Sequence, residues 1–236
     1  NWPHNKVDLK GKKVGIIGTG SSAIQCIPEI IKDVNHLYVF QRTPHYTVPA
    51  RNNPLKYSRG NTLDNPRAPI GYDDDLYVEE VKTHYSNFRL KAQNSVAALA
   101  LPINEESALE VSKYRRNEVY EDRWEKGGVP FIAAFQDLNF NRQANETAAE
   151  FVRSKIKTLV NDHKTAEMLT PTYPIGCKRL AVDSNYYETF NKTNISLIDL
   201  NTEPLDEFIT NGLSTDKNIY DLDVIILATG FDAMTG

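Results

Sequence analysis

The segment from Gly18 to Ala23, with the sequence GTGSSA, has the residue types of a phosphate-binding turn. It joins a short β-branched run to a segment with helical periodicity, so the free N–H groups at the helix start could bind a pyrophosphate. Gly18 allows a tight turn, Gly20 lets the backbone approach the phosphates, and Ala23 allows helix and strand to pack closely. Ser21 and Ser22 either donate to phosphate or only cap the helix. The motif predicts dinucleotide binding; the alternative is a glycine turn that serves packing alone.

A cation stands where many dinucleotide-binding folds have an acid. The second strand-like run, HLYVFQ, ends at Gln41 and is followed by Arg42 and Thr43. An acid at this place accepts hydrogen bonds from the adenosine ribose and repels a 2′-phosphate, whereas a guanidinium pairs with phosphate in a fork geometry. Arg42 therefore favours NADPH over NADH. The alternative is a solvated surface arginine.

A second basic pair, Lys178 and Arg179, follows Cys177 late in the chain. Adjacent side chains of an extended segment point in opposite directions, so one cation could face the cofactor phosphate and the other a second site. The residues alone leave open a plain surface pair. Cys177 is interpreted as a small packing residue rather than a nucleophile. The five histidines lack metal-ligand spacing and are interpreted as structural or surface groups.

The composition limits the function classes. The chain has 236 residues with 27 basic and 31 acidic side chains, a balance that argues against a general nucleic-acid binder. No apolar run is long enough to span a membrane, and no secretory signal begins the sequence. The two cysteines are far apart, so neither a disulfide framework nor a zinc site is expected, and no metal is assigned. A cytoplasmic protein is the default expectation.

The pattern of elements predicts an α/β fold: a Rossmann-like parallel sheet with a large helical insertion. Residues 1–54 form the first part of the predicted dinucleotide-binding domain, 55–168 the helical insertion, and 169–236 the return of the domain. Pro28 should kink or limit the first helix. Asn145 is expected to cap a later helix. Residues 195–200 and 223–230 are strand-like, with a hairpin turn at Asn211-Gly212 between them. The last strand is expected to be central and parallel, because it is apolar without alternation.

Four blocks, taken together and in this order, resemble the type I Baeyer–Villiger monooxygenases: VGIIGTGSSAIQ, VFQRTPHYTVPARN, YPIGCKRL with YYETFN, and ILATGFDAMTG. The opening Trp2-Pro3 is similar to the end of that family's fingerprint. The resemblance covers the chain from end to end. It places the NADPH site at the following positions: Gly18, Thr19, Gly20, Ser21, Ser22, Ala23, Gln25, Arg42, Thr43, Lys178, Ala228, Thr229 and Gly230.

The resemblance implies an enzyme with two dinucleotides, FAD and NADPH, that inserts oxygen from O₂ into a ketone to give an ester or lactone. Arg179 matches the catalytic arginine whose charge would stabilise the anionic peroxyflavin and the tetrahedral adduct. The family's FAD-binding glycine motif is absent, so the chain is expected to be the NADPH domain alone, folded but inactive as an oxygenase, with the FAD domain of the same enzyme as its partner. Two alternatives stay open: the NADPH domain of an N- or S-oxygenating class B flavin monooxygenase, and a stand-alone NADP-binding module.

Overall fold

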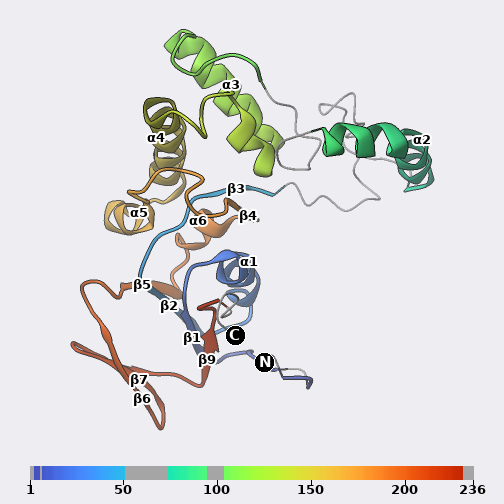
Figure 1. Ribbon diagram of the computed structural model, residues 1–236. Helices are drawn as coiled ribbons and strands as arrows, with labels where there is room; N and C mark the ends of the chain where they lie inside the picture. The colour runs from blue at the N-terminus through green and yellow to red at the C-terminus, as the bar shows by residue number, and fades with distance from the viewer. Residues whose placement is uncertain (1–2, 6, 51–73, 95–103, 231–236) are drawn as a thin grey trace. The chain divides into compact units, whose positions relative to one another are not determined.

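The computed structural model describes residues 3–5, 7–50, 74–94 and 104–230 (Figure 1). The chain divides into two compact units: residues 1–48 with 145–236, and residues 49–144. This division differs from the boundaries expected at 54/55 and 168/169: residues 49–54 join the second unit, and residues 145–168 join the first. Three parts of the sequence analysis lie outside the described residues: the stretch from Pro66 to Gly71, whose prolines and glycine predict a loop, Trp2 of the fingerprint, and the end of the last block, 231–236.

The core of the first unit is a four-stranded parallel sheet in the order β5-β2-β1-β9. The strands are β1 (Lys13–Ile17), β2 (His36–Gln41), β5 (Ile195–Asp199) and β9 (Val224–Leu227). Counted along the chain the order is third, second, first, fourth, as in a Rossmann sheet, so the direction of the winding changes between β1 and β9. The predicted α/β class with a parallel sheet is confirmed.

The prediction of a central last strand is wrong for the described sheet. β9 pairs in parallel with β1 alone and forms an edge. Its residues are only partly buried, and Leu227 is 65% exposed. An apolar run without alternation indicates two apolar faces, but it carries no information on whether both edges of the strand are paired.

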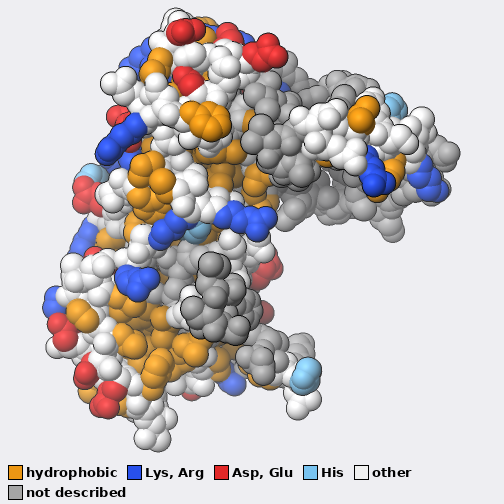
Figure 2. All heavy atoms as spheres, viewed as in Figure 1, with side chains coloured by type: hydrophobic (Ala, Val, Ile, Leu, Met, Phe, Trp, Pro, Cys, Tyr) orange, Lys and Arg blue, Asp and Glu red, His pale blue; other side chains and the backbone are white. Residues whose placement is uncertain are grey.

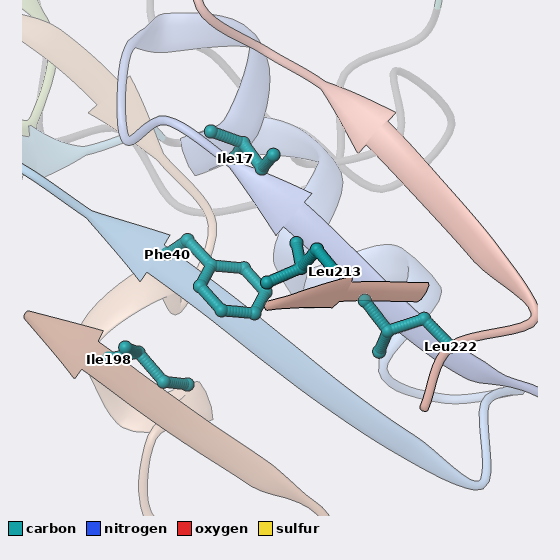
Figure 3. Packing of buried hydrophobic residues seen from close by; sticks show 5 residues of the cluster. All are labelled: Ile17, Phe40, Ile198, Leu213 and Leu222. Atoms are coloured by element: carbon teal, nitrogen blue, oxygen red, sulfur yellow. The ribbon is translucent and has the colours of Figure 1, made fainter. Parts of the chain in front are cut away.

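One face of the sheet packs against a three-stranded antiparallel meander, β6 (Leu205–Ile209), β7 (Gly212–Thr215) and β8 (Ile219–Asp221). The hairpin between the two strand-like runs forms as expected, but its turn is Thr210-Asn211, one residue before the predicted Asn211-Gly212, because Gly212 already belongs to β7 and pairs with Ile209. β8 extends the hairpin by one strand. Figure 3 shows the apolar cluster that joins meander and sheet. Its members are Ile17, Phe40, Ile198, Leu213 and Leu222.

The residues that alternate with this cluster face the other way and are fully buried. These are Val14 and Ile16 in β1, and Leu37 and Val39 in β2. Helix α1 (Ser21–Ile30) buries Ala23, Ile24 and Ile27 and continues for two residues past Pro28. It packs against β4 (Ala181–Asp183) and α6 (Tyr186–Thr189). β4 forms a second small sheet with β3 (Thr47–Pro49).

The prediction that Asn145 caps a helix is wrong. Helix α4 (Arg142–Leu159) begins earlier, where Asn141 Oδ1 accepts hydrogen bonds from the N–H groups of Gln143 (2.8 Å) and Ala144 (3.2 Å). Asn145 is a buried helical residue whose Nδ2 donates to the Ile175 carbonyl (2.8 Å). Asn139, Asn141 and Asn145 all precede the apolar stripe, and the capping preference alone cannot choose between them. Helix α5 (His163–Leu169) follows α4 and is capped by Asp162.

The second unit is helical where it is described. It contains α2 (Asp74–Gln93), α3 (Lys113–Lys126) and a 3-10 turn, η2 (Val129–Ala133). Ser112 caps the start of α3, and Gly127 ends it with a φ of 70°, so the GGVP sequence at 127–130 separates α3 from η2. None of the helices in the described part of the chain has both the length and the apolar character to cross a membrane.

The two glycines of the turn after β1 have opposite surroundings. Gly18 has a φ of +106°, and a Cβ built there would lie 2.5 Å from the Ala228 carbonyl oxygen of β9's extension. Gly20 is extended, with a φ of −82°, and a Cβ there meets no atom within 4 Å. The fold therefore leaves no room for a side chain at Gly18, whereas the open space beside Gly20 is available to a ligand.

We expect Gly18→Ala to lower the free energy of unfolding by about 2 kcal/mol or more, because it combines a strained φ with a backbone clash. Gly20→Ala is the matched control, and its cost should stay within about 1 kcal/mol, since the backbone angles suit alanine. Urea unfolding of the two variants and the parent measures both values. Equal losses for the two variants would contradict this assignment of roles.

Candidate functional site

A pocket of about 770 Å³ opens at the carboxyl ends of β1 and β9, where the winding of the sheet changes direction. Ligands of open α/β sheets bind at such a switch point. The pocket lies wholly within the first unit. Figure 2 shows hydrophobic side chains gathered over the region of β1, β2 and β9, with Lys and Arg side chains next to them. The lining residues are 16–22, Cys26, Phe40, Arg42, Thr43, His45, Lys178, Leu200 and 226–230.

The N-terminus of α1 forms one wall of the pocket. Gly20 is its N-cap, no side chain caps the first turn, and no acidic residue lies there. The free N–H groups and the helix dipole therefore offer positive partial charge to an anion. Thr19 Oγ1 donates to the Thr43 carbonyl (2.8 Å), which ties this turn to the segment after β2. The wall has the form and polarity of a pyrophosphate cradle.

Two cations that are far apart in the sequence, Arg42 and Lys178, also line the pocket. The Asn201 side chain donates to the Arg42 carbonyl, and the Leu200 N–H donates to the Gln41 carbonyl (2.8 Å), so the end of β5 holds the end of β2. No Asp or Glu occurs among the described residues that line this pocket. The site therefore favours a ligand with more than one anionic group.

Most of the residues predicted from the sequence meet in this one pocket. These are Gly18, Thr19, Gly20, Ser21, Ser22, Arg42, Thr43, Lys178, Ala228, Thr229 and Gly230. Three others do not line it. Ala23 is a buried residue of α1, Gln25 is exposed on the same helix, and Arg179 is exposed beside Lys178 but outside the lining. Cys177 is also exposed, so its interpretation as a packing residue is wrong.

Several lining residues were missed by the sequence reasoning, above all His45 and Cys26. His45 Nδ1 lies 3.1 Å from the Tyr173 hydroxyl. Burial lowers the pKa of His45, and the nearby charge of Lys178 lowers it further. Burial raises the pKa of the Cys26 thiol, which faces the pocket from α1. Metal-ligand spacing does not identify His45 as a pocket residue. Its position three residues after Arg42 is the signal that could have done so, because both residues belong to the loop after β2. No cluster suited to a metal ion occurs within the described ranges.

The sheet order, the glycine turn and the free helix start define a Rossmann-like unit of the dinucleotide-binding class. A scan against models of known protein families finds no match. A Baeyer–Villiger monooxygenase of Pseudooceanicola batsensis is 37% identical over 100% of this chain and 40% of its own length. The phenazine N-monooxygenase PhzNO1 of Lysobacter antibioticus is 34% identical, again over 100% of this chain and 40% of the relative. A solved structure of an oxidised steroid monooxygenase bound to NADP has a TM-score of 0.86 and 43% identity, covering 100% of this chain and 42% of that one.

Over its whole length the chain is homologous to the type I Baeyer–Villiger monooxygenases. It spans about two fifths of the length of the curated relatives that it matches.

We expect the imidazole of His45 to titrate below the ordinary value of about 6.5, because burial and the ammonium of Lys178 both disfavour the charged ring. As the pH falls, the unfolded chain then binds this proton first, so His45 lowers stability from about pH 6.5 downward. NMR titration of the histidine ring protons measures the midpoint, with His45→Gln to assign the signal. A midpoint above about 6.5 would refute the description of this site.

Proposed function

We propose that this chain is the NADPH-binding domain of an FAD-dependent Baeyer–Villiger monooxygenase that converts ketones into esters or lactones with O₂. The observation that carries the proposal is the pocket at the β1/β9 switch point, which combines a free helix start with Arg42 and Lys178 and has no acidic side chain among its described lining residues. Homology to the Baeyer–Villiger monooxygenases over the full chain supports it. NADPH, the FAD-binding domain of the same enzyme and a ketone are the proposed partners.

In this proposal different lining residues bind different parts of the cofactor. The N-terminus of α1, with Gly20, Ser21 and Ser22, would hold the pyrophosphate. Arg42 and Lys178 would bind the 2′-phosphate, with the Thr43 hydroxyl as a further donor. Bound NADPH would supply a hydride for flavin reduction. NADH lacks the 2′-phosphate and would leave both cations without their partner.

Arg179 would act outside the phosphate site. Its side chain is exposed and absent from the pocket lining, so it is available to a group that approaches from the solvent side. We propose that its guanidinium stabilises negative charge that develops during oxygen insertion, which is a stabilisation realised mainly in the transition state. FAD would be held by parts of the full-length enzyme other than this pocket, and residues 1–236 alone would bind NADPH without oxygenating a ketone.

A second candidate function is oxygenation of nitrogen. The phenazine N-monooxygenase PhzNO1 matches the chain nearly as well as the ketone-oxidising relatives do. The proposed NADPH pocket would serve both reactions, because it binds the cofactor and not the substrate that is oxygenated. A comparison of ketones with aromatic N-heterocycles as substrates of the full-length enzyme separates the two functions.

Arg42→Ala should weaken NADPH binding roughly tenfold or more and leave NADH binding within about twofold. The lost charge-assisted hydrogen bonds correspond to ~1.5–3 kcal/mol, and the side chain is exposed, so folding should be unaffected. Calorimetric titration of both cofactors measures the two affinities. Equal weakening of NADPH and NADH binding would remove Arg42 from the phosphate site.

Arg179→Ala in the full-length enzyme should lower ester formation at least ~100-fold while NADPH affinity changes little, because the side chain lies outside the pocket lining. Lys178→Ala is the matched control and should weaken NADPH binding instead. Product analysis under saturating NADPH and ketone gives the rates, and residues 1–236 with added FAD serve as a blank. Ester formation at the parent rate would exclude the proposed role of Arg179.

A further inference from the structure

Two segments that are distant in the sequence carry the cations of the pocket, and tyrosine hydroxyls fasten these segments together. Residues 42–47 follow β2, and residues 171–178 follow α5. The hydroxyl of Tyr46 donates to the Pro171 carbonyl (3.2 Å), that of Tyr173 to the Pro44 carbonyl (3.2 Å), and that of Tyr187 to the His45 carbonyl (3.0 Å). The bonds of Tyr46 and Tyr173 join the two segments to each other. The bond of Tyr187 joins the first segment to helix α6. The loop that carries Arg42 is thus held against the loop that carries Lys178.

Tyr173 has the central place in this arrangement. Its ring lies beneath the ammonium of Lys178, with Nζ 5.1 Å from the ring centroid, and it meets Tyr46 edge-on at 5.3 Å. The Tyr173 hydroxyl has one hydrogen, which it donates to the Pro44 carbonyl. In the 3.1 Å contact with His45 the hydroxyl oxygen is therefore the acceptor and the imidazole Nδ1 the donor. Burial raises the pKa of Tyr173 to about 12, so the hydroxyl remains a donor at neutral pH.

Tyr173 is absent from the pocket lining, whereas Lys178 and His45 belong to it. It can therefore influence a ligand only through these neighbours. A lysine side chain has many rotamers, and ordering it upon binding costs conformational entropy. A ring that already holds the ammonium reduces this cost, because the cation–π contact exists before the ligand arrives.

We propose that Tyr173 is a positioning residue for cofactor discrimination: its ring sets the Lys178 ammonium opposite Arg42, so that both cations meet one phosphate. This inference rests on the proposed function and deepens it, because it names a residue behind the pocket that determines the preference for NADPH. The hydroxyl contributes separately, since it fixes the distance between the two loops through Pro44. The preference for NADPH over NADH then depends on Tyr173 and Lys178 together, rather than on Lys178 alone.

The experiment measures the NADPH and NADH affinities of residues 1–236 and three variants by calorimetry. Tyr173→Leu removes the ring and should weaken NADPH binding about tenfold, with NADH within twofold. Tyr173→Phe keeps the ring beneath Lys178 and should retain the ratio of the two affinities within about threefold. Tyr186→Phe is the control, because the buried Tyr186 hydroxyl has no hydrogen-bond partner among the residues that the structure describes, and its loss should change neither affinity.

A double-mutant cycle with Lys178→Ala tests the route of the effect. Once Lys178 is removed, Tyr173→Leu should cause less than a twofold further loss of NADPH affinity, because the two residues act as a unit. Thermal unfolding confirms that each variant is folded, and Tyr173→Phe still tests the loop contact if Tyr173→Leu does not fold. An unchanged affinity ratio in folded Tyr173→Leu, or equal losses for both cofactors, would overturn this inference. A parent chain without preference for NADPH would instead overturn the proposed function itself.

Discussion

The close approach of β1 and β9 beside Gly18 is the constraint on which the pocket depends. The Ala228 N–H donates to the Ile17 carbonyl (2.8 Å), and the Gly18 N–H donates to the Phe40 carbonyl (3.0 Å), so three strands are joined at their carboxyl ends. A side chain at position 18 would occupy the place of the Ala228 carbonyl. Because the strand ends meet here, the start of α1, the loop after β2 and residues 228–230 all border one space. The chemistry of the site therefore follows from a backbone contact that only glycine permits.

The positive character of the pocket is local. The whole chain carries a net charge of −4, yet the pocket combines a free helix start, Arg42 and Lys178 and has no acidic side chain among its described lining residues. An overall excess of acid keeps the protein from attracting polyanions in general, while the pocket selects a small anion of defined shape. Composition argues against a general nucleic-acid binder, but only the structure shows that two cations distant in the sequence line one pocket.

The sequence allowed the β-turn-α-β unit, the parallel sheet and the hairpin of the meander to be predicted, because their signals lie in contiguous residues. The failures have a common cause: they depend on contacts between distant segments. The edge position of β9 depends on which strands pair, and the burial of Asn145 depends on the Ile175 carbonyl thirty residues away. His45 was interpreted as a structural or surface group because its neighbours, Tyr173 and Lys178, are more than a hundred residues distant. The sequence identified the glycine turn that lines the pocket, but not the distant side chains that surround it.

The segment around Lys178 shows how one short loop can serve two sites. Residues 176–179 are exposed, but they lie between two buried anchors, Ile175 and Leu180. Asn145 holds the Ile175 carbonyl, and the ring of Tyr173 holds the Lys178 ammonium. With both ends fixed, a span this short has little freedom, so ordering Lys178 also restricts the backbone of Arg179. In the proposed function the same anchors would therefore place the phosphate-binding cation and the guanidinium needed for oxygen insertion, which couples recognition of the cofactor to the chemistry that follows.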